Sequence, residues 1–205
     1  MRITGGSAAG KVVSVPAGLG VRPTPEKVRQ AIFNSLSHRI DGARVLELFG
    51  GSGALSLEAL SRGASSALCI EKSPKHARFI RNNVRECQFT SYTFEVRTGD
   101  AFTHSQRLVG ESQIFDFIFA DPPYGEKNIG FRSQSLAQKS IDDMNLPLLL
   151  SDGGQFLIGH ARRDQVEIPP HWQEVKALKH GDNWIRILTP AHAQPSSESI
   201  SDSGP

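Results

Sequence analysis

Four consecutive residues, Asp121-Pro122-Pro123-Tyr124, carry the strongest chemical signal in the chain. They follow the apolar run 114–120, which predicts a buried strand, so they stand at a strand's carboxyl end. A carboxylate and a rigid proline carbonyl can accept the two protons of an exocyclic amine, while an aromatic ring stacks on the base. Those hydrogen bonds free the lone pair of the amine nitrogen. The motif therefore predicts methyl transfer to a base amine, with Asp121, Pro122, Pro123 and the ring of Tyr124 as the catalytic residues. An ordinary turn after a strand is the alternative.

A glycine-rich turn stands between a predicted strand and a predicted helix earlier in the chain. Residues 43–49 predict the strand, residues 50–53 (Gly-Gly-Ser-Gly) the turn, and residues 53–62 the helix. A second apolar run at 66–71 predicts the next strand. Glycines in such a turn let the backbone approach a ligand closely, with helix N–H groups facing it. The segment is therefore a βαβ unit with a nucleotide-binding crevice.

Acidic residues at the strand ends indicate which nucleotide this crevice holds. A dinucleotide site has the pattern G-x-G-x-x-G, and Ser56 stands at its third glycine. Glu47 lies within the first strand, where it suits the ammonium group of an amino-acid ligand better than a pyrophosphate. Glu71 follows Gly53 by 18 residues, where a ribose hydroxyl needs an acceptor, and Asp100 ends the next strand, where it would take an adenine amine. S-adenosylmethionine carries all of these groups, so we expect it as the cofactor.

One segment matches the sequence pattern of a phosphate-binding loop but lacks the structural context that such a loop requires. Residues 5–11 fit the pattern G-x-x-x-x-G-K, but Val12 stands where Mg²⁺ needs a Ser or Thr. The following residues, 12–16, are β-branched and end at a proline, which predicts a strand where that motif requires a helix. We therefore exclude a nucleotide triphosphatase.

The amino-terminal region is more basic than the rest of the chain. Residues 1–44 contain seven Lys or Arg against two acids, although the net charge of all 205 residues is only +2. A basic region of this kind indicates a polyanionic partner. Residues 1–20 predict a hairpin, and a helix follows to about Ile40, with Thr24 either capping that helix or, with Arg22, covering a flipped base. The candidate substrate-binding residues are Lys11, Arg22, Thr24, Lys27 and Arg29.

Strands and helices alternate after this region. The alternation predicts an α/β fold, a parallel sheet with helices on both faces and a ligand at the carboxyl ends of its strands. Residues 191–205 are rich in Ser, Pro and Gly, so we expect a disordered tail. Besides those given above, the predicted elements are helices at 74–86, 101–109 and 134–149, strands at 92–98, 114–120 and 154–160, and a hairpin at 173–190.

Composition and length exclude several other classes of protein. No apolar run approaches the roughly 20 residues of a transmembrane helix. The first residues lack the apolar core of a signal peptide, and two cysteines make no disulfide framework, so we expect a cytoplasmic protein. We expect no metal site and a monomer.

The chain resembles the RsmD family of bacterial small-subunit ribosomal RNA guanine-N2 methyltransferases. The similarity lies in residues 1–6, in 22–34 (including Arg22-Pro23-Thr24), in 46–55 and 58–64, and in the motif 121–124. It implies a class I S-adenosylmethionine-dependent, Rossmann-like methyltransferase fold, with seven strands of which the last is antiparallel. It also implies an RNA-binding extension over residues 1–42, a methyltransferase domain over 43–190, and ribosomal RNA or a small-subunit particle as partner. The cofactor-binding residues are then Glu47, Phe49, Gly50, Gly51, Ser52, Gly53, Glu71, Lys72, Asp100, Ala101 and Asp121.

The chain departs from the family pattern at three places, and three other functions stay open. Gly50 replaces an alanine, His160 stands where an acid is expected after the fifth strand, and the turn 181–184 is unusual for the family. A DNA adenine-N6 methyltransferase would use the same chemistry, but those enzymes carry a longer recognition region. A non-catalytic RNA-binding protein would not need Asp121, and protein glutamine methyltransferases have Asn at that position.

Overall fold

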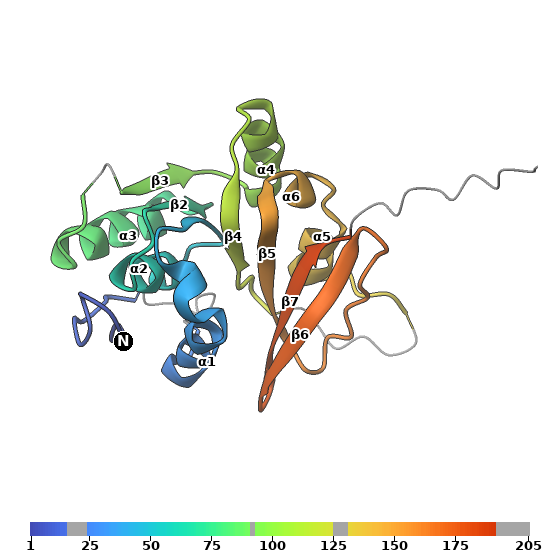
Figure 1. Cartoon of the computed structure of the whole chain (residues 1–205), viewed down its shortest axis with the longest axis horizontal. Helices are drawn as coiled ribbons and strands as arrows, with labels where there is room; N and C mark the ends of the chain where they lie inside the picture. The colour runs from blue at the N-terminus through green and yellow to red at the C-terminus, as the bar shows by residue number, and fades with distance from the viewer. Residues whose placement is uncertain (16–23, 91–92, 125–130, 192–205) are drawn as a thin grey trace, which may run out of the picture.

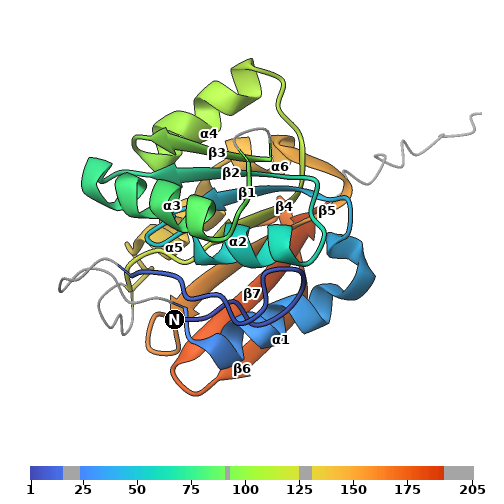
Figure 2. The same ribbon diagram turned by 90° about the vertical axis from the view of Figure 1, so that its left-hand side faces the viewer.

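The computed structural model describes residues 1–15, 24–90, 93–124 and 131–191. A seven-stranded sheet runs through its centre, with helices packed on both faces (Figures 1 and 2). The strands are β1 (Arg44–Leu48), β2 (Ser66–Glu71), β3 (Phe94–Thr98), β4 (Phe115–Ala120), β5 (Leu150–Ala161), β6 (Trp172–His180) and β7 (Asn183–Pro190). The helices are α1 (Glu26–Leu36), the 3₁₀ helix η1 (Ser37–Ile40), α2 (Ala54–Ser61), α3 (Pro74–Glu86), α4 (Ala101–Gly110), α5 (Leu136–Asp142) and α6 (Asn145–Leu148).

The strand order is β3-β2-β1-β4-β5-β7-β6. β1 is parallel to both β2 and β4, β2 is parallel to β3, and β4 is parallel to β5. β7 is antiparallel to β5 and to β6, so the last strand in the sequence runs against all the others. The predicted seven-stranded, mostly parallel α/β sheet is confirmed.

The central strands β1, β2 and β4 are buried on both faces, as is usual for parallel strands, whereas the edge strands β3 and β6 are largely exposed. Successive residues of β1 point to opposite sides: Val45 packs in one hydrophobic cluster, with α1, α2 and α3, and Leu46 in the other, with α4, α5 and α6. Phe117 and Ile118 of β4 divide in the same way. The core therefore has two hydrophobic layers, one on each face of the central strands. Packing on both sides holds these strands, and the residues that follow their carboxyl ends, in fixed positions.

The amino-terminal segment packs against the same core. Arg2 and Val12 form an isolated antiparallel bridge, so the chain turns back on itself within residues 1–15 as the predicted hairpin requires. The last part of that hairpin, residues 16–20, lies outside the described residues. Ile3, Ala8 and Val13 are buried in the cluster that contains α2. The predicted helix to Ile40 ends as an α-helix at Leu36, because Ser37 has a φ of 50° and the chain continues as η1.

The predicted helix over 134–149 is divided into α5 and α6. Asp143 is extended (φ −70°, ψ 105°), and its carboxylate accepts the backbone N–H of Asn145 at 3.0 Å, which starts a new helix. β5 begins earlier than predicted, at Leu150, because Gly153 and Gly154 lie inside it and disguise its pattern. The predicted tail falls outside the described residues from 192 onward.

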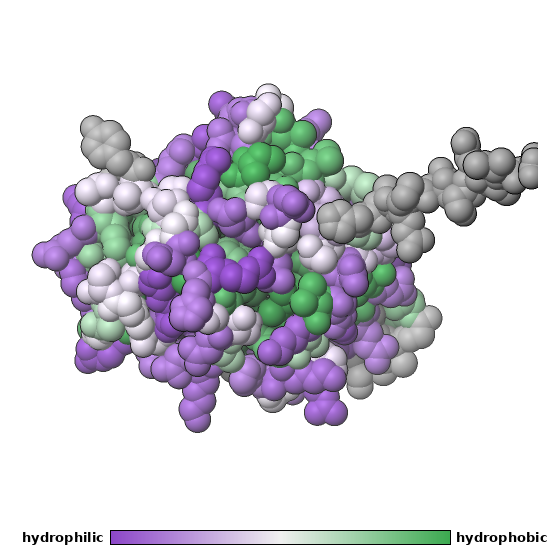
Figure 3. Space-filling view, in the orientation of Figure 1, coloured by the Kyte–Doolittle hydropathy of each residue, from purple (hydrophilic) through white to green (hydrophobic). Residues whose placement is uncertain are grey.

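The surface carries polar side chains with smaller apolar areas between them (Figure 3). Met144 and Leu148, at α6, are about 60% exposed. Within the ranges that the structure describes, none of the helices has the length and apolar character needed to cross a membrane.

Candidate active site

A cleft of about 590 Å³ opens beside the carboxyl ends of β1, β2 and β4. After β3 the chain crosses back over β1 to form β4, so the cleft lies where the strand order reverses, the usual ligand site in open α/β sheets. The cleft brings together all the predicted catalytic residues and ten of the eleven predicted cofactor-binding residues; Gly53 is the exception. Thr24 also lines it.

The glycine turn is built from left-handed backbone. Phe49, Gly51 and Gly53 have φ values of 59°, 57° and 75°, a region that favours glycine. The N–H of Gly53 donates to the carbonyl of Gly50 at 2.7 Å, which closes the turn. Gly53 then starts α2 and faces the core: a Cβ there would lie 2.8 Å from Cγ2 of Ile80. Gly53 therefore shapes the turn without lining the cleft.

Gly50 is explained by its neighbour in β2. A Cβ on Gly50 would lie 2.3 Å from Sγ of Cys69 and 3.0 Å from Cδ1 of Ile80. Cys69 is fully buried, so its sulfur fills the space that an alanine at position 50 would need. In this chain the packing against Cys69 therefore requires glycine at position 50.

Glu47 supports the glycine turn from below. Its side chain is buried, and its two oxygens accept the backbone N–H groups of Ser56 at 2.9 Å and Leu55 at 3.3 Å, in the first turn of α2. Burial raises the pKa of Glu47 to about 7, although the bonds from Ser56 and Leu55 work in the opposite direction. Glu47 also borders the cleft, so near neutral pH its carboxylate can gain or lose a proton beside the ligand.

Glu71 ties β2 to the same turn. One of its oxygens accepts the N–H of Gly51 at 2.7 Å, and the other accepts that of Ser73 at 2.7 Å. Nδ1 of His76 lies 3.6 Å from the second oxygen. The carboxylate is therefore fixed at the cleft wall with room for further hydrogen bonds, since each oxygen can accept two.

Asp100 and Lys72 form the next part of the wall. Asp100 caps α4 by accepting the N–H groups of Phe102 at 3.1 Å and Thr103 at 3.4 Å, and Lys72 lies 3.3 Å from its other oxygen. Partial burial opposes ionisation of Asp100, but the hydrogen bonds from Lys72, Thr103 and Phe102 together lower its pKa. Phe49 packs edge-on against Phe102, with ring centroids 6.0 Å apart. A charged group thus stands beside an apolar wall.

Asp121 is held by two elements that sequence patterns do not connect to it. The hydroxyl of Thr24, which is buried just before α1, donates to Oδ2 of Asp121. Gly159 of β5 leaves space on the other side, where a Cβ would lie 2.5 Å from Oδ1. Burial raises the pKa of Asp121, and the bond from Thr24 partly offsets this. The expected capping role of Thr24 is wrong, because α1 begins at Glu26 and has no side-chain cap.

Pro122, Pro123 and Tyr124 continue along the cleft. The hydroxyl of Tyr124 donates to Oδ1 of Asn183, the first residue of β7. The stacking of the Tyr124 ring on a base stays a prediction, and this bond adds a structural role of the hydroxyl that was not predicted, since it fixes where the ring lies. The unusual turn at 181–184 is therefore joined directly to the catalytic motif.

The family follows from comparison with known proteins. The family profile described as "Conserved hypothetical protein 95" matches residues 1–189. The chain belongs to this family. The "Putative rRNA methyltransferase YlbH" of Bacillus subtilis is 35% identical over 169 residues, which cover 82% of this chain and 86% of that protein. The "Ribosomal RNA small subunit methyltransferase D" of Buchnera aphidicola is 26% identical over 170 residues, which cover 83% of each. A solved structure described as "Putative methyltransferase yhhF from Escherichia coli" matches with a TM-score of 0.74 and 27% identity, over 93% of this chain and 97% of that one.

These matches confirm the resemblance to the RsmD family and the class I methyltransferase fold. Within that fold, the predicted substrate-binding residues of the amino-terminal region are distributed unevenly. Lys27 is exposed, and Lys11 is half-buried, with its ammonium 3.1 Å from Oε1 of Gln88. Arg22 lies outside the described residues.

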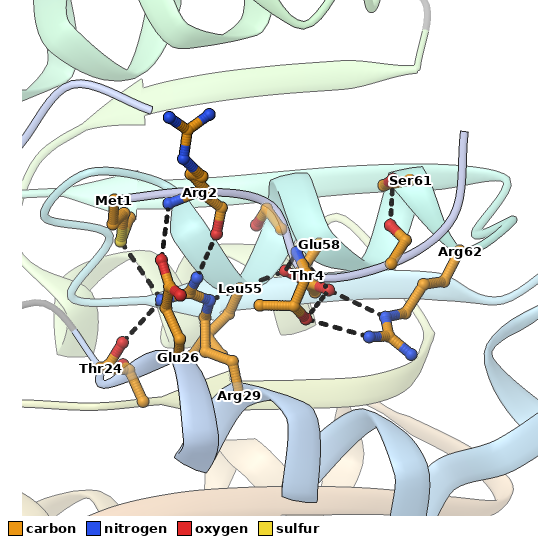
Figure 4. A network of polar contacts seen from close by, with 12 residues as sticks. Met1, Arg2, Thr4, Thr24, Glu26, Arg29, Leu55, Glu58, Ser61 and Arg62 are labelled. Atoms are coloured by element: carbon orange, nitrogen blue, oxygen red, sulfur yellow. Dashed lines mark hydrogen bonds and ion pairs between the residues drawn. The ribbon is translucent and has the colours of Figure 1, made fainter. Parts of the chain in front are cut away.

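Arg29 does not reach the surface, so its predicted contact with substrate is wrong. Its side chain is 1% exposed, and its Nε lies 3.7 Å from a carboxylate oxygen of Glu58 in α2. Its guanidinium also donates to the carbonyls of Thr24, at 2.7 Å, and of Arg2 (Figure 4). Arg29 therefore joins three segments inside the protein. The sequence pattern disguised this role because α1 carries it on an otherwise apolar face.

Several residues that line the cleft, such as Ser73, His76 and Phe102, were not predicted, and neither were two residues that hold the catalytic motif. Gly159 interrupts an apolar strand, and an isolated glycine in a strand often marks a close approach by another group. Asn183 has no comparable signal, because its partner lies 59 residues away in the chain. Among the described residues, no three His, Cys, Asp or Glu side chains are grouped so that they could hold a metal ion.

Proposed function

We propose that the protein uses S-adenosylmethionine to methylate the exocyclic N2 amine of a guanine in small-subunit ribosomal RNA. One observation carries this proposal: a half-buried carboxylate with a raised pKa, Asp121, stands at the end of β4 and lines a cleft of nucleotide size, with Pro122 and Tyr124 next to it. The relatives named as ribosomal RNA methyltransferases support RNA as the substrate.

The residues around the cleft fit the cofactor group by group. Gly51 has no side chain and lies in left-handed backbone, so a ligand can approach the main chain there. Glu71 would accept the ribose hydroxyls, and Asp100, beside the rings of Phe49 and Phe102, would accept the adenine amine. Glu47 would face the ammonium group. When bound, the cofactor supplies an activated methyl group.

The role of the protein in the reaction is to orient the amine and to stabilise the positive charge that develops on its nitrogen. Asp121 would accept one amine proton and the carbonyl of Pro122 the other, which localises the lone pair on nitrogen. As the nitrogen bonded to the methyl carbon and the bond from that carbon to the cofactor's sulfur broke, the nitrogen would gain positive charge, so the hydrogen bond to Asp121 would strengthen toward the transition state. The methylated nitrogen, then cationic, would lose one proton to a nearby carboxylate or water. Tyr124 would stack on the base and hold it in line with the methyl group.

The experiment that tests this function is transfer of labelled methyl from S-adenosylmethionine to small-subunit particles, to naked ribosomal RNA and to duplex DNA. Digestion to nucleosides then identifies the product. We expect N2-methylguanosine from ribosomal RNA or particles. Label in N6-methyladenine from DNA would establish the alternative of a DNA adenine methyltransferase, and label in no nucleic acid would contradict the proposal.

A further inference from the structure

The tip of the β6–β7 hairpin lies at the same edge of the sheet as the catalytic motif. β5 is parallel to β4, so its last residues stand at the edge where Asp121 follows β4. β7 is antiparallel to β5, so its first residue, Asn183, stands at that edge and pairs with His180 across the hairpin. The N–H of Arg162 donates to the carbonyl of Asp182 at 2.8 Å, which joins the segment after β5 to the turn.

Basic side chains gather at this tip. We define the tip cluster as Arg162, Arg163, Lys179 and His180, all of which are exposed. Within the described part of the chain, none of the four forms an ion pair. Arg162, Arg163 and Lys179 of the tip cluster therefore present cationic groups that no carboxylate of the described residues pairs with.

Lys179 is also held in place. Its ammonium lies 4.4 Å from the centroid of the Trp184 ring, a cation–π contact that orders a side chain without neutralising it. Arg186 of β7, whose guanidinium carbon lies 5.6 Å from the centroid of the same ring, differs because it forms an ion pair of 2.6 Å with Glu174. Two further acids lie close in the chain: Asp182 is exposed in the turn, and Asp164 is buried and accepts a bond from Ser133. Basic groups therefore outnumber exposed unpaired acids at the tip.

The tip is physically joined to the catalytic motif. Asn183, within the turn region, accepts the hydroxyl of Tyr124, the residue that would stack on the target base. The turn beside Asn183 is bonded to Arg162, and both Arg162 and Arg163 are exposed and form no ion pair among the described residues. Arginine forks match phosphate geometry.

We propose that the tip cluster binds the phosphates of the RNA strand that flanks the target nucleotide, and that the β6–β7 hairpin is thus a second substrate-binding surface besides the amino-terminal region. This inference rests on the proposed function for the identity of the ligand. Phosphate contacts position a strand without reading its sequence, so the tip cluster would set the register of the target base over Tyr124.

Helix α3 supplies a matched control. It carries exposed Lys75, Arg78 and Arg85, which also form no ion pair among the described residues. α3 lies against β2 and β3, at the opposite end of the sheet from the hairpin (Figure 1). A variant with Arg162, Arg163 and Lys179 changed to Gln and one with Lys75, Arg78 and Arg85 changed to Gln lose the same charge from two different places.

The experiment measures binding of labelled small-subunit ribosomal RNA to the full chain at several salt concentrations. We expect the tip variant to bind about tenfold or more weakly, with a salt slope smaller by about 2, since each lost phosphate contact lowers it by roughly 0.7 to 0.9. The α3 variant should change far less. Asp182→Asn should bind RNA more tightly than the unaltered protein, and cofactor affinity should stay the same in all three.

Three results would overturn the inference. The tip variant could bind RNA as the unaltered protein does, or both triple variants could weaken binding equally, which would show only an effect of net charge. The tip variant could also bind naked RNA normally but lose binding to small-subunit particles, which would assign the hairpin to a ribosomal protein. Binding is measured without methyl transfer, so a failure of the proposed reaction would be visible separately, as an absence of methylated product from the unaltered protein.

Discussion

At the scale of single residues, Asp121 is the group on which the proposed chemistry depends most. Asp121→Ala should lower kcat by roughly 10²–10³, the usual effect of deleting one preorganised polar group, while cofactor affinity stays nearly unchanged. Asp121→Asn should retain some activity because its amide oxygen still accepts a hydrogen bond. Single-turnover methyl transfer with saturating cofactor and RNA measures the effect.

A substitution on the neighbouring strand gives an independent test of the same carboxylate. Gly159→Ala would place a Cβ 2.5 Å from Oδ1 of Asp121 and so displace it without changing its chemistry. We expect a loss of kcat with normal cofactor binding. Wild-type turnover in both Asp121→Ala and Gly159→Ala would rule out the mechanism.

Tyr124 is the second residue whose environment makes a prediction. Its hydroxyl donates to Asn183, so Tyr124→Phe loses one hydrogen bond, worth about 0.5–1.5 kcal/mol, and should raise KM for RNA by roughly two- to tenfold. Tyr124→Ala also loses the stacking ring and should have a larger effect, about 1–3 kcal/mol. Steady-state kinetics with RNA as the varied substrate would separate KM from kcat.

The matched control for Tyr124 lies in the hairpin. Asn183→Ala should resemble Tyr124→Phe, because it removes the acceptor of the same hydrogen bond. Because the two residues share one bond, the double variant Tyr124→Phe, Asn183→Ala should be no worse than either single change. Fully additive effects would show that the bond has no role in holding the ring.

At the scale of elements, the unit of β1, the glycine turn and α2 should respond to pH through Glu47. Its pKa is about 7 in the protein alone because burial opposes ionisation. If the cofactor's ammonium group lies against Glu47, binding must lower that pKa, so binding at pH 6–6.5 should release protons and affinity should rise toward pH 7.5. Calorimetry in two buffers of different ionisation enthalpy measures the protons released.

The control for this prediction is Glu47→Gln, which cannot titrate. Asp121 also has a raised pKa and lines the cleft, so some proton release could arise there. Release that disappears in Glu47→Gln belongs to Glu47, and release that persists unchanged belongs to another group. In the second case the ammonium of the cofactor does not contact Glu47.

The sequence could predict those helices and strands whose ends are marked by nearby residues, such as a capping side chain, a proline or a turn. α3 was expected at 74–86 and is observed at Pro74–Glu86, because Ser73 accepts the N–H of His76 as a cap and Pro74 opens the helix. β2 and the β6–β7 hairpin also lie where their apolar patterns end in turns. The break between α5 and α6 was missed because it depends on the extended backbone of Asp143 and on its hydrogen bond from Asn145, within a continuous apolar pattern.

The candidate site divides in the same way. Residues at the ends of successive parallel strands must meet at one edge, so Glu71, Asp100 and Asp121 could be predicted to share a cleft. The bond from Thr24 to Asp121 spans 97 residues, and no spacing rule connects them. The burial of Arg29 was unpredictable for the same reason, since it depends on Glu58 lying opposite it in the folded chain.

At the scale of the whole molecule, Arg29 joins the amino-terminal segment, α1 and α2. The buried carboxylate of its partner Glu58 also accepts a hydrogen bond from the backbone N–H of Thr4 at 2.9 Å (Figure 4). The same carboxylate forms an ion pair with Arg62, whose Nε lies 2.9 Å from Oε1 of Glu58. Burial lowers the pKa of Arg29, with Glu58 acting in the opposite direction. The network fixes the carbonyl of Thr24, and with it the hydroxyl that holds Asp121. The amino-terminal region therefore helps to position Asp121, besides being a proposed contact for RNA.

This arrangement predicts that two neighbouring basic residues of α1 affect different properties, one the stability of the protein and the other the salt dependence of RNA binding. Arg29→Met leaves the carbonyls of Thr24 and Arg2 without their donor, so we expect the free energy of unfolding to fall by about 3 kcal/mol, while the salt dependence of RNA binding stays the same. Lys27 is exposed, so Lys27→Gln should leave stability unchanged and lower the salt slope by roughly 0.7–0.9. Urea unfolding and RNA binding at several salt concentrations measure the two properties. A reduced salt slope in Arg29→Met, with stability intact, would mean that Arg29 reaches the RNA and that its burial against Glu58 is not the state that binds substrate.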